Sequence, residues 1–171
     1  AKGENLDGHL LPGLEPRGVP RELGDTTHPF NYNDFEALEH IVATQDIGVI
    51  KMEVMRNAEP ENDFLHRVRK LADDKGIVLI FDECTSGFRE TFGGLHKKYG
   101  VDPDLAVFGK TLGNGYAVTC VIGREDVMQA AQTTFISSTF WTERIGSAAA
   151  LKTLEVMERE KSWDYITDMG H

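Results

Sequence analysis

The sequence predicts an α/β fold in which a mostly parallel sheet carries helices on both faces. Two continuous apolar runs, residues 78–81 and 105–108, are typical of strands that are buried in a parallel sheet. The amphipathic segment between them, from about Phe88 to Tyr99, is predicted to form the crossover helix. Apolar and amphipathic segments alternate along the rest of the chain, which indicates a three-layer α/β/α arrangement.

Residues 1–33 are rich in glycine and proline. These residues break long helices and central strands, so we expect an irregular arm that lies over another part of the protein. We expect this arm to be the continuation of a longer element.

Regular patterns begin at Asn33 or Asp34, either of which could cap a helix with an apolar stripe. Residues 48–54 are predicted to form a strand with Glu53 near its carboxyl end. A second helix is expected from about residue 61 to residue 75, where Gly76 ends it.

The C-terminal third continues the alternation. The glycine-rich segment 113–115 leads into a strand over residues 117–122, followed by a short helix over residues 124–131. Residues 135–139 are polar and extended, and a long helix is expected from about residue 142 to residue 161. The residues expected to face inward on this helix are Ile145, Ala149, Leu151, Leu154 and Met157.

Composition narrows the class of protein. A length of 171 residues predicts one domain, and a net charge of -10 argues against binding to nucleic acid or to an anionic membrane. Two cysteines, Cys84 and Cys120, do not suggest a disulfide framework or a zinc cluster, and we expect no metal site. The sequence shows no membrane-spanning run and no signal peptide, so a cytoplasmic protein is the default expectation.

Ionisable residues follow both central strands. Asp82 ends the first apolar run, and Gly109-Lys110 ends the second. Ligands of open α/β sheets bind beyond the carboxyl ends of the strands. The sequence therefore predicts a carboxylate and an amine at one edge of the sheet.

One interpretation of these residues is a nucleotide hydrolase, because Gly109-Lys110-Thr111 resembles the end of a phosphate-binding loop. That loop needs a glycine five residues before its Gly-Lys pair, and this chain has Asp104 there. A carboxylate would repel phosphates, which argues against this interpretation.

The other interpretation takes Lys110 as a nucleophilic amine. A lysine at a strand end can form a Schiff base with an aldehyde if burial lowers its pKa. A carboxylate on the next strand can pair with the pyridine nitrogen of pyridoxal phosphate. Each residue also has a structural interpretation, with Asp82 as a helix cap and Lys110 as a solvated charge.

A set of ordered motifs supports the second interpretation. The segment from about Gly48 to Glu158 resembles the class III aminotransferases, which are fold-type I pyridoxal-phosphate enzymes, and looks nearest to the glutamate-1-semialdehyde aminomutase branch. The matching motifs are Phe81-Asp82-Glu83, Gly87-Phe88-Arg89, Gly93-Gly94, residues 99–105, and Gly109-Lys110 with Gly113 and Gly115.

The resemblance implies a role for several residues. Lys110 matches the Schiff-base lysine, and Asp82 matches the aspartate that pairs with the pyridine nitrogen. Thr139 matches a threonine that reaches the cofactor phosphate of the adjacent subunit, which implies a homodimer. Thr85 stands where several relatives have a glutamine near the ring oxygen, and Glu53 matches a strand-end glutamate near the site.

The chain also departs from the family pattern. Glu53-Val54 and Arg56-Asn57 replace the usual Glu-Pro and Gly-Asn, and residues 140–144 replace small residues. These departures leave the substrate class open. By resemblance, residues 1–171 are expected to form part of the large, cofactor-binding domain, without the N-terminal phosphate-binding loop and stacking aromatic and without the C-terminal small domain.

The implied function is transfer of an amino group between a small-molecule amino donor and a keto acid or aldehyde, through a Schiff base on Lys110. An aminomutase, which moves the amino group within one substrate, is an alternative. A catalytically inactive fragment of such an enzyme is another.

Overall fold

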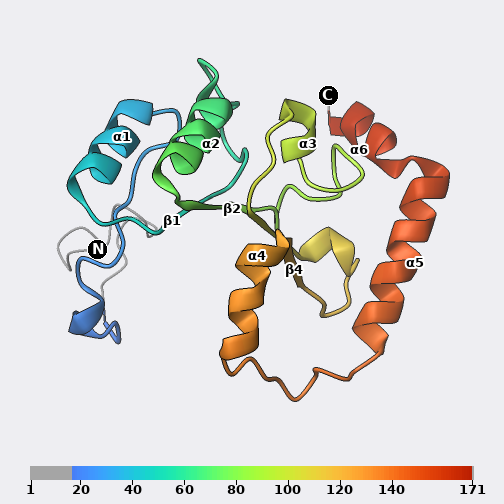
Figure 1. The fold of residues 1–171 in the computed structure, drawn as a ribbon. Helices are drawn as coiled ribbons and strands as arrows, with labels where there is room; N and C mark the ends of the chain where they lie inside the picture. Colours follow the sequence, from blue (N-terminus) through green and yellow to red (C-terminus); the bar gives the residue numbers. More distant parts are fainter. Residues whose placement is uncertain (1–16, 171) are drawn as a thin grey trace. The chain divides into compact units, whose positions relative to one another are not determined.

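The computed structural model describes residues 17–170, whose helices and strands are drawn in Figure 1. The chain forms two compact units, residues 1–47 and residues 48–171. The irregular arm expected over residues 1–33 falls partly on residues 1–16, which lie outside the described part. Residues 17–33 contain turns and one short 3₁₀ helix, η2 (Arg21–Leu23).

The first unit contains the helix that the sequence predicts after Asn33. Helix α1 (Phe35–Thr44) is capped by Asp34, whose side chain accepts a hydrogen bond of 3.0 Å from the Ala37 N–H. Such a cap satisfies one of the amide groups that a helix leaves without a partner at its start. Phe35 and Leu38 are buried, as the apolar stripe predicts.

The second unit is built on a four-stranded sheet with the order β1-β2-β3-β4. The strands are β1 (Val49–Met52), β2 (Val78–Asp82), β3 (Leu105–Phe108) and β4 (Cys120–Gly123). Strands β1, β2 and β3 are parallel, and β4 pairs with β3 in the antiparallel direction. The mostly parallel α/β fold is therefore confirmed for this part of the chain.

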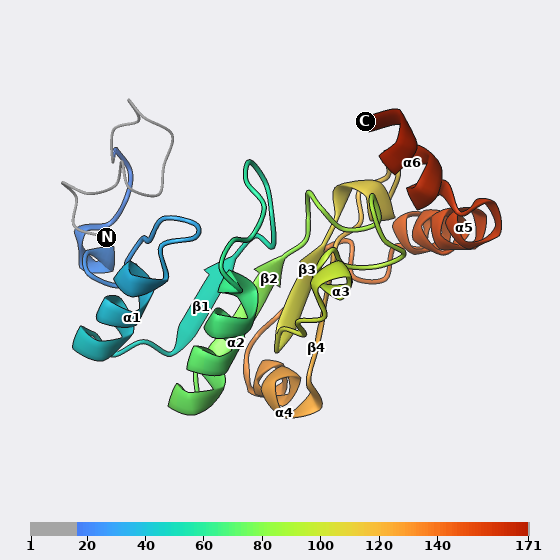
Figure 2. The same cartoon turned by 90° about the horizontal axis from the view of Figure 1, so that it is seen from above.

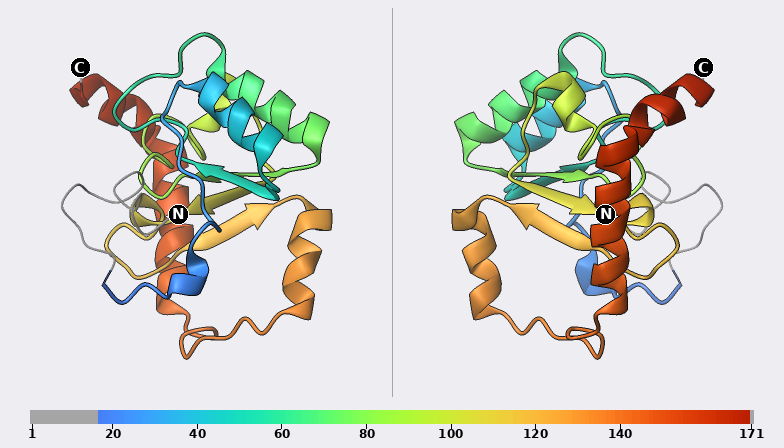
Figure 3. Two further views of the ribbon diagram at one scale, coloured as in Figure 1. Left: turned by 90° about the vertical axis from the view of Figure 1, so that its left-hand side faces the viewer. Right: turned by 90° about the vertical axis from the view of Figure 1, so that its right-hand side faces the viewer.

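Helices α2 (Phe64–Lys75) and α3 (His96–Tyr99) lie on one side of the sheet (Figures 2 and 3). The sheet buries this side through alternate strand residues: Ile50, Met52, Leu79, Phe81, Ala106 and Phe108. The intervening residues point to the other side and are partly or fully exposed: Val49, Lys51, Val78, Ile80, Asp82, Leu105, Val107 and Val121. The apolar runs predicted burial on both faces, whereas the described strands are fully buried on one.

Helix α2 packs Phe64, Leu65 and Val68 into the core, each with at most 2% of its surface exposed. It ends at Gly76, which adopts the left-handed conformation with φ +66°. Glycine pays no side-chain penalty there, so the predicted stop signal is confirmed.

The long crossover helix expected from Phe88 to Tyr99 is wrong over most of its length, because only α3 is helical. Phe88 has φ +59° and Gly93 has φ +125°, and both values are incompatible with an α-helix. The Phe88 N–H instead donates to the Gly93 carbonyl at 2.7 Å, which closes a loop. The apolar spacing of this segment serves loop packing, as the burial of Leu95 shows.

The C-terminal region contains 3₁₀ helix η3 (Lys110–Leu112), helix α4 (Glu125–Met128), 3₁₀ helix η4 (Gln129–Thr133), and helices α5 (Ile145–Glu160) and α6 (Ser162–Gly170). The sequence did not predict α6.

The inward face of α5 is also partly different from the prediction. Ile145 and Leu151 are 63% and 69% exposed, whereas Ala150 and Met157 are buried. Ala150 joins a core cluster with Ala106, Phe108 and Leu112. Within residues 17–170, no helix is both long enough and apolar enough to cross a membrane.

Candidate functional site

The carboxyl ends of β1, β2 and β3 bring three ionisable residues to one edge of the sheet. Glu53 follows β1, Asp82 ends β2, and Gly109-Lys110 follows β3. Because the three strands are parallel neighbours, these ends lie side by side. The predicted meeting of a carboxylate and an amine at one edge is therefore present.

Asp82 is held by two hydrogen bonds. Its Oδ1 accepts from the Cys84 N–H at 3.1 Å, and its Oδ2 accepts from Lys51 Nζ at 2.8 Å. Partial burial opposes ionisation, but these bonds, together with the charge of Lys51 and an interaction with the Cys84 thiol, hold the pKa of Asp82 below its ordinary value. Asp82 is thus a negatively charged acceptor at neutral pH.

Lys110 begins η3 with a left-handed backbone, φ +45°, which is uncommon for a residue with a side chain. Such backbone strain clusters at functional positions. Its Nζ donates a hydrogen bond of 2.7 Å to Oγ1 of Thr85, in the loop after β2. The side chain is exposed, so the described residues do not bury the Lys110 amine.

The loop after β2 is organised by Glu83, which is fully buried. Its carboxylate accepts from the His96 N–H at 3.0 Å, contacts His96 Nδ1 at 2.8 Å, and accepts a short hydrogen bond from the Ser86 hydroxyl. Burial opposes ionisation, but these bonds together hold the pKa of Glu83 below its ordinary value. Glu83 therefore fixes both ends of the loop that carries Thr85.

The local sequence pattern does not predict the roles of four residues of this site: Lys51, Glu83, Ser86 and His96. Lys51 had a detectable signal, because it is a charged residue at the third position of the strand Val49-Ile50-Lys51-Met52. Its partner depends on strand register, which the pattern of a single strand does not give. Glu83 directly follows Asp82, and its burial depends on the unexpected loop.

Thr139 lies exposed in the segment between η4 and α5. No hydrogen bond described for residues 17–170 joins it to Asp82, Thr85 or Lys110. Glu53 Oε1 pairs with Arg56 at 3.2 Å, and its Oε2 is a buried oxygen for which the described residues supply no hydrogen bond.

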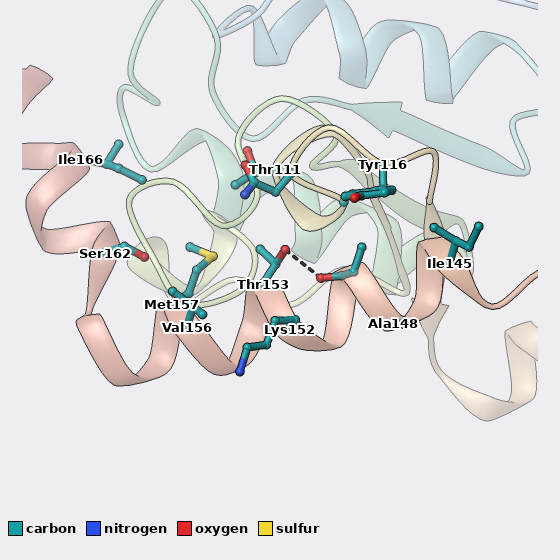
Figure 4. Close-up of a pocket in the computed structure, with 13 residues that line it drawn as sticks. Thr111, Tyr116, Ile145, Ala148, Lys152, Thr153, Val156, Met157, Ser162 and Ile166 are labelled. Carbon is teal, nitrogen blue, oxygen red and sulfur yellow. Dashed lines mark hydrogen bonds between the residues drawn. The ribbon is translucent and has the colours of Figure 1, made fainter.

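A cavity of about 710 Å³ lies beside this site, between the segment after Lys110 and helices α5 and α6 (Figure 4). Thr111 and Tyr116 line one wall, and Ala148, Val156 and Met157 line the helix wall. None of the residues predicted to bind a cofactor lines this cavity. The cavity is therefore adjacent to the strand-end site but separate from it.

Comparison with known proteins gives this site a family context. A family model described as aminotransferase class-III matches residues 35–171. A 3-aminobutyryl-CoA aminotransferase from Cloacimonas acidaminovorans (strain Evry) is 40% identical over 162 residues, which are 90% of this chain and 39% of the relative. A glutamate-1-semialdehyde 2,1-aminomutase from Sulfolobus acidocaldarius is 37% identical over 150 residues, which are 84% of this chain and 36% of the relative.

Solved structures agree with the fold. An omega-transaminase from Sphaerobacter thermophilus superposes with a TM-score of 0.76 at 27% identity, over 82% of this chain and 35% of that protein. An ornithine aminotransferase from Toxoplasma gondii, solved with partial occupancy of PLP at its active site, has a TM-score of 0.73 at 29% identity, over 80% of this chain and 34% of that protein.

The chain spans about two fifths of the length of the curated relatives it matches. The family model, however, covers most of the chain, from α1 to its last residue. The resemblance seen in the motifs around Asp82 and Lys110 is thereby confirmed, and the chain belongs to the class-III aminotransferase family.

Proposed function

We propose that this chain is part of a pyridoxal-phosphate-dependent aminotransferase that moves an amino group between a small-molecule amino donor and a keto acid or aldehyde. The observation that carries the proposal is the placement of Lys110 and Asp82 at the ends of adjacent parallel strands, with Thr85 in contact with the Lys110 amine. Family membership and the PLP-containing relative support it.

The residues at the strand ends fit the ring of this cofactor. An exposed primary amine, an ionised carboxylate and a hydroxyl group stand at one edge of the sheet. Bound pyridoxal phosphate would supply an aldehyde that reacts with an amine and a ring that accepts electrons. The chemistry of this donor set is the one that such a ring requires.

Each residue then has a distinct role. With the cofactor bound, Lys110 would provide the amine that holds it and would move a proton at the substrate Cα. Asp82, kept ionised by its hydrogen bonds, would hold a proton on the pyridine nitrogen. Thr85 orients the Lys110 amine through its hydroxyl group.

We also propose that Thr139 binds the cofactor phosphate of a second subunit in a homodimer. Large apolar side chains close to it in the sequence are exposed, including Phe135 at 97%, Phe140 at 75% and Trp141 at 69%. Contiguous exposed apolar residues are typical of a surface that another protein covers. Their position beside Thr139 supports a subunit contact that includes this threonine.

An intramolecular aminomutase is a second candidate, supported by 37% identity to glutamate-1-semialdehyde 2,1-aminomutases. The two candidates differ in the path of nitrogen. Incubation with a mixture of labelled and unlabelled amino substrates separates them, because an aminotransferase exchanges nitrogen between molecules and an aminomutase largely retains it.

Absorbance titration with pyridoxal phosphate tests the proposal. We expect a new near-ultraviolet or visible band in the wild type, absent in Lys110→Ala and retained in Lys152→Ala, because Lys152 is exposed and paired with Glu155 on α5. A band that persists in Lys110→Ala would contradict the assignment. No band in the wild type would favour the remaining alternative, a catalytically inactive fragment.

A further inference from the structure

The side of the sheet opposite helices α2 and α3 carries two charged residues among its described strand positions. These two residues pair with each other. Lys51 on β1 and Asp82 on β2 lie on this side, whereas the other strand residues that point there are apolar or glycine. The Lys51 Nζ lies 2.8 Å from Asp82 Oδ2. Lys51 is therefore a cation on a mostly apolar face of the sheet, in contact with the carboxylate of the proposed site. This position suggests that Lys51 affects the function of Asp82.

The geometry of the Asp82 carboxylate leaves room for a further donor. One oxygen accepts from the Cys84 N–H and the other accepts from Lys51. A carboxylate has about four lone-pair positions; these two bonds and the Cys84 thiol use at most three, so one remains for a further donor. A pyridine N–H could therefore bind Asp82 while Lys51 stays in place.

We propose that Lys51 is a positioning residue that pairs with Asp82 and so reduces the attraction between the Asp82 carboxylate and the protonated ring nitrogen of the cofactor. Lys51 thereby lowers the affinity of the protein for the cofactor. The proposal rests on the proposed function, because it takes Asp82 as the partner of that nitrogen. The backbone N–H of Cys84 keeps the carboxylate oriented without Lys51, so the effect of the lysine is mainly one of charge.

Cys84 offers a reporter of this charge that needs no cofactor. Burial and the negative charge of Asp82 raise the pKa of the Cys84 thiol, while Lys110 and Lys51 lower it. Burial alone raises the pKa of Cys120, which makes that thiol an internal control. Since the thiolate is the reactive form, the alkylation rate follows these charges.

The test compares Lys51→Met with Lys51→Arg in the protein, with Lys70→Met as a matched control, because Lys70 forms an exposed ion pair with Asp74 on α2. Iodoacetamide labelling is quantified by mass spectrometry of the peptides that contain Cys84 and Cys120. In Lys51→Met we expect Cys84 to react about two- to fivefold more slowly, the range for one partly exposed charge interaction, with Cys120 unchanged.

Pyridoxal phosphate titration provides the second measurement. In Lys51→Met we expect the dissociation constant to fall about two- to fivefold, while Lys51→Arg and Lys70→Met stay near the wild type. An unchanged rate of Cys84 alkylation in Lys51→Met would contradict an effect of the Lys51 charge on Asp82 and its surroundings. A slowed Cys84 rate with unchanged or weaker cofactor binding would overturn the role toward the ring. Absence of Lys110-dependent binding in the wild type would instead refute the proposed function.

Discussion

Lys110 Nζ donates a hydrogen bond of 2.7 Å to Thr85 Oγ1, which links the residue after β3 to the loop after β2. The amine of Lys110 is therefore positioned by a loop whose conformation depends on the buried Glu83 carboxylate. The position of the proposed nucleophile therefore depends on the contacts of Glu83 with Ser86 and His96 as well as on Thr85.

Replacement of Thr85 by valine should weaken reaction of Lys110 with pyridoxal phosphate. Valine keeps the shape of threonine but cannot accept the lysine hydrogen bond, which contributes about 0.5–1.5 kcal/mol. We expect the dissociation constant to rise about two- to tenfold. Thr85→Ser, which keeps the hydroxyl group, should stay near the wild type, and equal losses in both variants would argue against orientation by this bond.

Asp104 should be a main determinant of stability. Its carboxylate is 4% exposed and accepts from the Leu79 N–H at 2.7 Å, Arg69 at 2.9 Å and Arg124 at 2.8 Å. Asp104→Ala would leave a buried amide and the mostly buried Arg69 without this partner. We expect the free energy of unfolding in urea to fall by about 3 kcal/mol. A loss below about 0.5 kcal/mol, typical of surface substitutions, would contradict this role.

Stability should fall in acid because Glu83 and Asp104 have pKa values below their ordinary range, despite burial. A carboxylate with a lowered folded-state pKa stabilises the fold above the unfolded-state pKa, and this contribution is lost as the pH falls through the folded-state value. The free energy of unfolding should therefore decrease as the pH falls below about 4.

Urea unfolding at several pH values measures this dependence. Glu83→Gln should be less stable than the wild type at neutral pH but should show a shallower loss in acid, because one titrating group is gone. An acid dependence as steep as that of the wild type would show that Glu83 does not contribute to it.

Gly94 should not tolerate a side chain. A Cβ atom at this position would overlap the His96 ring and lie 2.8 Å from Glu83 Oε1. Gly94→Ala should displace His96 from Glu83 and lower the free energy of unfolding by about 1–3 kcal/mol. Gly48→Ala is the matched control, because a Cβ there meets no heavy atom within 4 Å. Similar stability changes in both variants would contradict the packing argument.

The sequence predicts the central strands well because buried strands are composed of consecutive apolar residues, which can be recognised locally. The runs 78–81 and 105–108 are apolar for their whole length; Asp82 follows the first directly, and Lys110 follows the second after Gly109. Parallel pairing then fixes that both residues meet at one edge. This part of the site follows from local pattern and sheet topology.

The rest of the site depends on contacts between residues distant in sequence. The loop after β2 forms because Glu83 binds His96, thirteen residues away, and no helical periodicity reports such a bond. Lys51 on β1 forms a hydrogen bond with Asp82 on the adjacent strand β2. On α5, the small residues Gly146 and Ala150 allow close packing, and hydrophobicity alone favoured the wrong residues, Ile145 and Leu151.

The most direct test of the account is to fix pyridoxal phosphate to the protein with borohydride and identify the modified lysine by mass spectrometry of the peptides. We expect the label on Lys110, and we expect Asp82→Ala to reduce the labelling at a given cofactor concentration. A label placed mainly on another lysine, such as Lys51, would contradict it.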